Sequence, residues 1–202
     1  MVRILWLGLL HQKIIMKFKF LIDLIKMESY RRLDIALTKK SSENFIFSED
    51  LTNEGVKMFH VTTLKMIKNK ISKQGEKSYF YGLLTYPCKF FIHIDLDDEE
   101  ININRAIKEI KKIMSVKVKI AKKGNLFYRL VFPSIIVNNS EEAEKKCKYL
   151  IEKMKSDVKD YIDTSTYFEN TQYLLLGCSK KKERICLESE KGSFSDFFLS
   201  SN

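Results

Sequence analysis

The segment Cys88–Asp97 reads CKFFIHIDLD, and its alternating pattern constrains the fold of this chain more than any other stretch. Side chains along a β-strand point in turn to opposite faces of the sheet. One face of this segment is therefore wholly apolar, with Phe90, Ile92, Ile94 and Leu96. The other face carries Phe91, His93, Asp95 and Asp97. The pattern predicts a strand that packs on a core and presents two carboxylates on its other side.

Hydrophobic periodicity in the rest of the chain predicts a mixture of helices and strands. Helices are expected from about Leu64, over 103–114, and from an Asn139 cap to about Ser156. Short strands are expected at 45–47, 59–61, 79–84, 116–120, 126–132, 161–163, 173–176 and 185–187. Because helices interrupt a series of strands, the sequence predicts an α+β domain whose helices pack on a largely antiparallel sheet.

These elements place a single domain at residues 45–190. Residues 1–44 are expected to form an N-terminal extension, with a basic amphipathic segment followed by a polar lead-in, and residues 191–202 a C-terminal tail. The apolar run Ile4–Leu10 is much shorter than the roughly 20 residues that cross a bilayer. No membrane span is therefore expected.

The net charge of the chain is +10, from 36 Lys and Arg against 26 Asp and Glu. Such a surplus makes a polyanion the first partner to consider. Nearly all of it is lysine, which contacts phosphate as a point charge, whereas arginine has the forked geometry that reads bases. The composition thus favours contact with a nucleic-acid backbone over sequence reading. The alternative is an AT-rich genome, which enriches lysine, isoleucine and asparagine without any binding function.

The four cysteines contain no Cys-x-x-Cys pair, so the spacing of a zinc ribbon is absent. They are Cys88, Cys147, Cys178 and Cys186. Reduced and mostly buried thiols are expected. The hydrophobic share of the chain is 45%, and 12% is aromatic, which is enough to form a core and excludes a wholly disordered basic protein.

Asp95 and Asp97 share one strand face, about 7 Å apart by the rise of a strand. Two such carboxylates repel each other unless a cation lies beside them, and hard oxygen ligands suit Mg²⁺ or Mn²⁺. A two-ion site needs a further carboxylate, for which Asp163 is the best candidate because it also follows an apolar residue at a strand edge. The alternative is a solvated strand end, since an Asp-x-Asp pattern is common.

Four stretches extend this motif in a characteristic order. They are Phe90–Asp97 (FFIHIDLD), Leu126–Phe132 (LFYRLVF), Ile162–Tyr167 (IDTSTY) and Thr171–Lys180 (TQYLLLGCSK). Together they resemble the archaeo-eukaryotic primase superfamily, above all its herpesvirus/PrimPol-like branch and the primases of large DNA viruses such as poxviruses. The Asp-x-Asp pattern is unspecific alone, but the combination at these distances is considerably more specific. The resemblance covers roughly residues 45–190.

The resemblance implies a primase-like core, with an RRM-like antiparallel sheet flanked by helices. It further implies a viral DNA primase catalytic subunit, a metal-dependent nucleotidyltransferase that makes primers on single-stranded DNA. Asp95, Asp97 and Asp163 would hold two ions, Mg²⁺ or Mn²⁺. The implied partners are nucleoside triphosphates, the DNA template and a replicative helicase or second primase subunit. The implied place is intracellular, at a viral replication site in the host nucleus or cytoplasm.

Two positions depart from the family pattern. Arg129 stands where the family has the histidine of an S-x-H motif, and Leu174 stands where it has an arginine. Arg129 still offers bidentate donors to a triphosphate. Lys180, which follows Gly177, and Lys123, beside the hairpin turn, are the other candidate phosphate contacts.

Two other interpretations remain open at this point. The first is a catalytically degenerate primase-like protein that keeps the fold and binds nucleic acid, which the two departures favour. The second is a basic structural or packaging protein of a virus with an AT-rich genome, in which the carboxylates are incidental.

Overall fold

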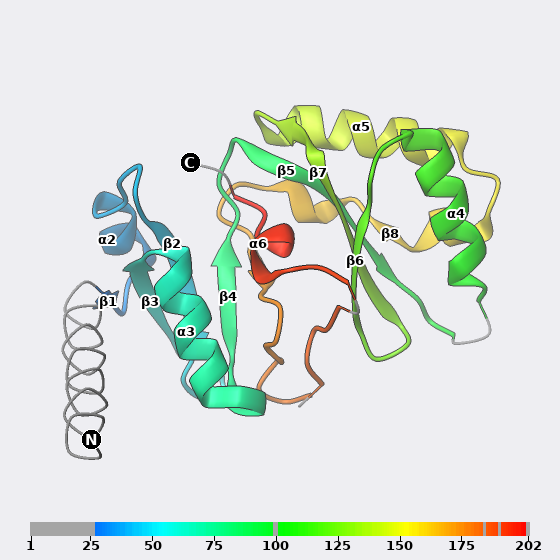
Figure 1. Ribbon diagram of the computed structural model, residues 1–202. Coiled ribbons are helices and arrows are strands. Elements are labelled where there is room, and N and C mark those ends of the chain that lie inside the picture. The colour runs from blue at the N-terminus through cyan, green and yellow to red at the C-terminus, as the bar shows by residue number, and fades with distance from the viewer. Residues whose placement is uncertain (1–26, 99–100, 184, 190, 201–202) are drawn as a thin grey trace, which may run out of the picture.

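The computed structural model describes residues 27–98, 101–183, 185–189 and 191–200, so the basic amphipathic segment lies outside the described residues. The architecture is α+β, as the order of elements predicts, but the strands form two antiparallel sheets rather than one. Figure 1 shows the two sheets side by side, with α3 (Leu64–Gln74) beside the first and α4 (Ile103–Met114) and α5 (Ser140–Lys153) beside the second.

The first sheet has five strands in the order β1-β3-β2-β4-β9. The strands are β1 (Glu28–Tyr30), β2 (Phe45–Asp50), β3 (Lys57–Thr62), β4 (Phe80–Leu83) and β9 (Gln172–Leu174). The polar lead-in thus belongs to this sheet, because β1 pairs with β3 and the short helix α2 (Leu33–Thr38) follows it. The strand β9 joins from the far end of the chain by pairing with β4.

The second sheet has four strands in the order β6-β7-β5-β8. The strands are β5 (Cys88–Asp95), β6 (Lys119–Lys123), β7 (Phe127–Val137) and β8 (Ile162–Asp163). With α4 after β5 and α5 after β7, the chain order is β-α-β-β-α-β, and neighbouring strands are antiparallel. This is the split β-α-β arrangement, in which the first strand lies between the third and the fourth.

Local sequence signals explain where the three long helices begin. A side-chain oxygen at each N-cap accepts a hydrogen bond from a backbone N–H of the first turn, which satisfies a donor that the helix itself leaves free. The caps are Thr63 for α3, Asn102 for α4 and Asn139 for α5. The observed bounds of α4 match the expected helix over 103–114.

Short single-turn helices complete the chain. They are the 3₁₀ turns η1 (Gly75–Lys77), η2 (Asp157–Tyr161) and η3 (Ser165–Tyr167), and the α-helical turn α6 (Phe194–Phe197). The strand expected at 185–187 is absent from the described residues. Instead, isolated bridges join Cys186 to Ser179 and Glu188 to Lys122.

The C-terminal segment, expected as a tail, is part of the core. Phe194, Phe197, Phe198 and Leu199 are buried. The Ser200 hydroxyl donates to the Leu83 carbonyl on β4 at 2.9 Å, and the Lys89 N–H on β5 donates to the Leu199 carbonyl at 2.8 Å. These residues therefore connect the two sheets, and one large hydrophobic cluster includes side chains from both.

All four cysteines are free thiols, as expected, and Cys88, Cys147 and Cys178 are buried. Burial raises the pKa of Cys88 and of Cys178 to about 12. Both thiols therefore stay protonated at neutral pH and pack as small apolar groups.

Candidate functional site

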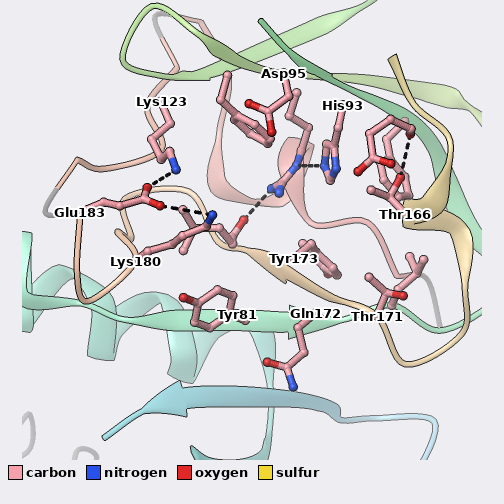
Figure 2. A pocket seen from close by; sticks show the side chains of 16 residues that line it. Tyr81, His93, Asp95, Lys123, Thr166, Thr171, Gln172, Tyr173, Lys180 and Glu183 are labelled. Carbon is pink, nitrogen blue, oxygen red and sulfur yellow. Dashed lines mark hydrogen bonds and ion pairs between the residues drawn. The ribbon is translucent and has the colours of Figure 1, made fainter. Parts of the chain in front are cut away.

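A cavity of about 400 Å³ lies at the junction of the two sheets. Its lining comes from β5, β6, β7 and β8 of the second sheet, from β4, β9 and the residues next to them in the first, from η3, and from the turn after Gly177. Figure 2 shows the polar side chains of this lining. Residues up to about 100 positions apart in the sequence, from Tyr81 to Glu183, thus converge here.

Five of the six site residues expected from the sequence line this cavity. They are Asp95 at the end of β5, Asp163 in β8, Arg129 in β7, Lys123 at the end of β6, and Lys180. These five residues combine two carboxylates with three cations, and a third carboxylate, that of Glu183, also lines the cavity.

The sixth residue, Asp97, does not line the cavity. The strand β5 ends at Asp95 rather than at Asp97, because the chain bends after Leu96, whose N–H still donates to the Leu126 carbonyl. Asp97 is exposed beyond that bend. Strand alternation therefore no longer places its side chain beside that of Asp95.

Three polar residues form a row across the middle of the second sheet. The register pairs His93 with Asp163 on one side and with Arg129 on the other. Directly paired residues of neighbouring strands lie on the same face. The row therefore runs from a carboxylate through an imidazole to a guanidinium, and all three side chains line the cavity.

Arg129 is the central cation of the site, and its side chain is almost completely buried, with 1% exposed. Its Nε donates to Nε2 of His93 at 2.8 Å, and its Nη1 donates to the Leu174 carbonyl at 2.5 Å. The guanidinium carbon also lies 5.5 Å from the centre of the Tyr173 ring. Because Leu174 and Tyr173 belong to β9, Arg129 links the second sheet to the first.

Burial lowers the pKa of Arg129 to about 10, which still leaves the guanidinium charged at neutral pH. Burial, and then the charge of Arg129, lower the pKa of His93 well below its usual value. His93 is therefore neutral and accepts the hydrogen bond at Nε2. Arg129 forms no ion pair with any residue in the described part of the chain. A buried cation without a counter-ion costs free energy, which an anion in the cavity would offset.

Lys123 and Lys180 both pair with Glu183, as the dashed lines in Figure 2 show. The Lys180 Nζ lies 3.3 Å from Oε1, while Lys123 contacts Oε2. Glu183 is thus placed as the counter-ion of two cations that were expected to bind phosphate. An anionic ligand at these lysines would compete with its carboxylate.

The two carboxylates differ in their surroundings. Asp163 is partly buried, and its Oδ1 accepts hydrogen bonds from the backbone N–H and the hydroxyl of Ser165, at 2.8 and 2.7 Å. Asp95 is exposed at the strand end. Both are hard oxygen donors of the kind that Mg²⁺ and Mn²⁺ prefer. Within the described residues, however, no three His, Cys, Asp or Glu side chains come together as a metal site.

Two residues of the site were given no role by the sequence. His93 had a visible signal, since strand alternation already put it on the face of Asp95. Glu183 had none, because it lies in an irregular segment between Lys180 and Ile185, where no period places a side chain. Only the fold of the turn after β9 brings it to the lysines.

Comparisons with known proteins add no family to this description. A scan against protein-family models found no match, and neither did a search of curated proteins. Among the helices that the structure describes, none is both long enough and apolar enough to cross a membrane.

Proposed function

We propose that this protein is a metal-dependent nucleotidyltransferase of the primase type, which joins nucleoside triphosphates on a single-stranded DNA template. The observation that carries the proposal is one cavity that collects Asp95 and Asp163 together with Arg129, Lys123 and Lys180. Nucleotidyl transfer needs acidic groups for metal and cationic groups for the triphosphate in the same place.

The triphosphate end of the site is assigned to the three cations. Arg129 is held rigidly by His93 and Leu174, so it offers its remaining N–H groups in a fixed orientation. Lys123 and Lys180 add positive charge in the cavity once Glu183 releases them. Together they would neutralise a polyphosphate and orient it within the cavity.

The carboxylate end of the site would hold the metal. Mg²⁺ is commonly bound by one or two protein carboxylates, with phosphate oxygens and water completing its shell, so we assign Asp95 and Asp163 as the protein donors. A bound ion supplies charge stabilisation at the reacting phosphate and activation of the attacking hydroxyl. Asp163 is kept in place by Ser165, while Asp95 is free to adjust at the strand end.

The topology of the second sheet supports the same proposal. Its β-α-β-β-α-β order with antiparallel neighbours agrees with the RRM-like core that a primase-like chain is expected to have. Fold alone does not imply activity. The proposal therefore depends on the side chains of the cavity.

Primer synthesis tests the proposal directly. Purified protein would be incubated with homopolymer and mixed single-stranded DNA, labelled ribo- or deoxyribonucleoside triphosphates, and Mg²⁺ or Mn²⁺. Short products are expected from the wild type, and Asp95→Asn and Asp163→Asn should lower their yield at least about 100-fold. The matched control is Asp160→Asn, an exposed carboxylate in η2 outside the cavity. Absence of product from the wild type, or full yield from Asp95→Asn, would contradict the proposal.

A second candidate function is a nucleotide-binding module without catalysis. Two observations favour it. Asp97 lies outside the cavity, and Glu183 already forms ion pairs with Lys123 and Lys180. This candidate predicts that a labelled nucleoside triphosphate binds in the cavity and is released unchanged. Any template-dependent product that Asp163→Asn abolishes would exclude it.

A further inference from the structure

A second hollow, about 740 Å³ in volume, lies on the opposite side of the β6–β7 hairpin. Neighbouring residues of a strand point to opposite faces. Accordingly, Lys123 and Phe127 line the first cavity, whereas Lys122 and Tyr128 line this second hollow. We call it the basic groove, and it is bounded by α4, β6, β7 and residues 188, 189 and 191.

Positive charge dominates the basic groove. Its lysines are Lys111, Lys117, Lys119, Lys122 and Lys191, and among the residues that the structure describes, Glu188 is the acidic one in its lining. Lys119 pairs with Asp196 at 3.3 Å. The other four form no ion pair with any residue that the structure describes. Four cations along one groove therefore remain available to an external anion.

The floor of the basic groove is apolar. Ile103 and Ile107 come from α4, Val118 and Ile120 from the β6 side, and the ring of Tyr128 from β7. A groove that bound only phosphate groups would need the lysines but no apolar surface. Lysines above an apolar and aromatic floor match a single-stranded nucleic acid, whose phosphates are charged and whose bases need surfaces on which to stack.

One wall of the groove is held in place by hydrogen bonds. Lys122 and Glu188 exchange two backbone hydrogen bonds, both 2.8 Å long. The Ser189 hydroxyl donates to the Ile120 carbonyl, also at 2.8 Å. Residues 188–189 thus extend the edge of β6, so the groove is formed before any ligand arrives.

We propose that the basic groove binds a single-stranded polynucleotide, with phosphates on its lysines and bases on the floor around Tyr128. The inference rests on the groove and goes beyond the proposed function, which concerns the first cavity. A nucleic-acid strand in the groove would lie on the other side of the β6–β7 hairpin from the cavity that Asp95 and Arg129 line. The lysines of the groove would contact phosphate groups, which DNA and RNA share, and would not sense the 2′-hydroxyl of RNA. DNA and RNA strands are therefore both expected to bind.

Binding would be measured by fluorescence anisotropy with labelled oligo-dT and oligo-rU of about 16 nucleotides, the upper range of such site sizes. No metal or nucleoside triphosphate is added. The variant Lys111→Glu/Lys117→Glu/Lys122→Glu should weaken both affinities at least about 30-fold. Each phosphate contact contributes about 0.7 to the slope of log Kd against log salt for single strands, so that slope should fall by about 2.

The matched control is Lys65→Glu/Lys68→Glu/Lys77→Glu. These exposed lysines on α3 and η1 give the same change in net charge, and they lie outside the groove. The control should change affinity less than about threefold. An equal loss in both triple variants would show attraction by net charge only and overturn the inference, as would unchanged binding by the groove variant.

A second measurement does not depend on the folding of a variant. Oligo-dT carrying 4-thiothymidine would be photo-crosslinked to the wild-type protein, and the labelled peptide should include Tyr128 or residues 117–122. Labelling confined to other peptides would overturn the inference. So would a duplex or poly-glutamate that competes as well as the single strand, because neither uses the apolar floor. A protein that binds strands through the groove but makes no primer contradicts only the proposed function.

Discussion

Arg129 on β7 donates a hydrogen bond to the Leu174 carbonyl on β9, and this bond crosses from the second sheet to the first at the cavity. The same guanidinium donates to His93 in its own sheet. One buried side chain therefore serves as a connection between the sheets and as the central cation of the site. Its substitution should affect both stability and ligand binding.

Arg129→Lys tests these two roles. A lysine ammonium is compact and lacks the fork that reaches His93 and Leu174 while still offering donors to a ligand. Affinity for a nucleoside triphosphate, measured by calorimetry, should fall at least about 10-fold. Arg105→Lys, at an exposed arginine of α4, is the control and should have no effect. Lower thermal stability with unchanged affinity would show that Arg129 has only a structural role.

Glu183→Gln should change affinity in the opposite direction. Removal of this carboxylate leaves Lys123 and Lys180 without their shared counter-ion, so a triphosphate no longer has to displace it. The dissociation constant should fall about 3- to 10-fold, equivalent to roughly 1 kcal/mol. Glu43→Gln gives the same charge change at an exposed loop position and controls for net charge. A weaker complex in Glu183→Gln would mean that the lysines do not contact the ligand.

Asp95→Asn and Asp97→Asn should differ sharply, although both belong to the same Asp-x-Asp motif. Asp95 lines the cavity, while Asp97 lies beyond the end of β5. Primer synthesis should be lost in Asp95→Asn and retained within about threefold in Asp97→Asn. Equal loss in both would require the segment after β5 to move Asp97 into the site when ligands bind.

Gly82→Ala should destabilise the pairing of β4 with β9, two strands that line the cavity. Gly82 on β4 pairs with Tyr173 on β9, and a Cβ at this glycine would lie 2.6 Å from the Tyr173 hydroxyl. Tyr173 is 3% exposed, so a shift of its ring would disturb the side chains packed against it. Unfolding in urea should show a loss of about 1–3 kcal/mol. In a Gly82→Ala/Tyr173→Leu double variant, the loss should be smaller than the sum of the two single losses.

Acid stability should depend on Glu49 in β2. Burial alone would raise its pKa, but the hydrogen bond from His60 at 2.9 Å and the contact with Lys70 at 2.8 Å lower the pKa to about 2. The unfolded chain takes up this proton first as pH falls below about 4.5, so the contribution of Glu49 is complete above that pH and lost toward pH 2. Its full size is up to about 3 kcal/mol.

The measurement is the free energy of unfolding of the wild type and of Glu49→Gln across this pH range. The difference between them should be largest at neutral pH and shrink as the pH approaches 2. A difference that stays constant with pH would show that the carboxylate charge of Glu49 does not stabilise the fold.

Local elements were predictable because their signals are local. The alternation in Phe90–Ile94 identifies β5, and the apolar spacing in 103–114 identifies α4. The cap residue Asn139 marks the start of α5, since its side chain accepts the Glu142 N–H at 2.8 Å. Each of these features depends on residues within a few positions of one another.

The division into two sheets was not predictable in the same way. It depends on β9 pairing with β4, about 90 positions earlier, and on residues 198–200 reaching both sheets. The C-terminal segment shows no period, because a single turn of helix is too short to display one. Its aromatic residues were the available sign that it belongs to the core.

The candidate site was predictable only in part. Asp95, Asp163, Arg129 and the two lysines came from the motif order, and they do line one cavity. Asp97 was grouped with them because strand alternation was extended two residues too far. The pairing of Glu183 with both lysines depends on an irregular turn, for which the sequence contains no pattern.

The row of Asp163, His93 and Arg129 makes one face of the cavity electrostatically asymmetric, with a carboxylate at one end and a guanidinium at the other. Neighbouring strands lie about 4.8 Å apart, so the strands that carry the negative and positive side chains are about 10 Å apart, with a neutral ring between them. A ligand with one cationic and one anionic end would pair with opposite charges of this row in one orientation, whereas the reversed orientation would place like charges together. The order of charges along a ligand, and not only its net charge, would therefore affect how the ligand binds along this row.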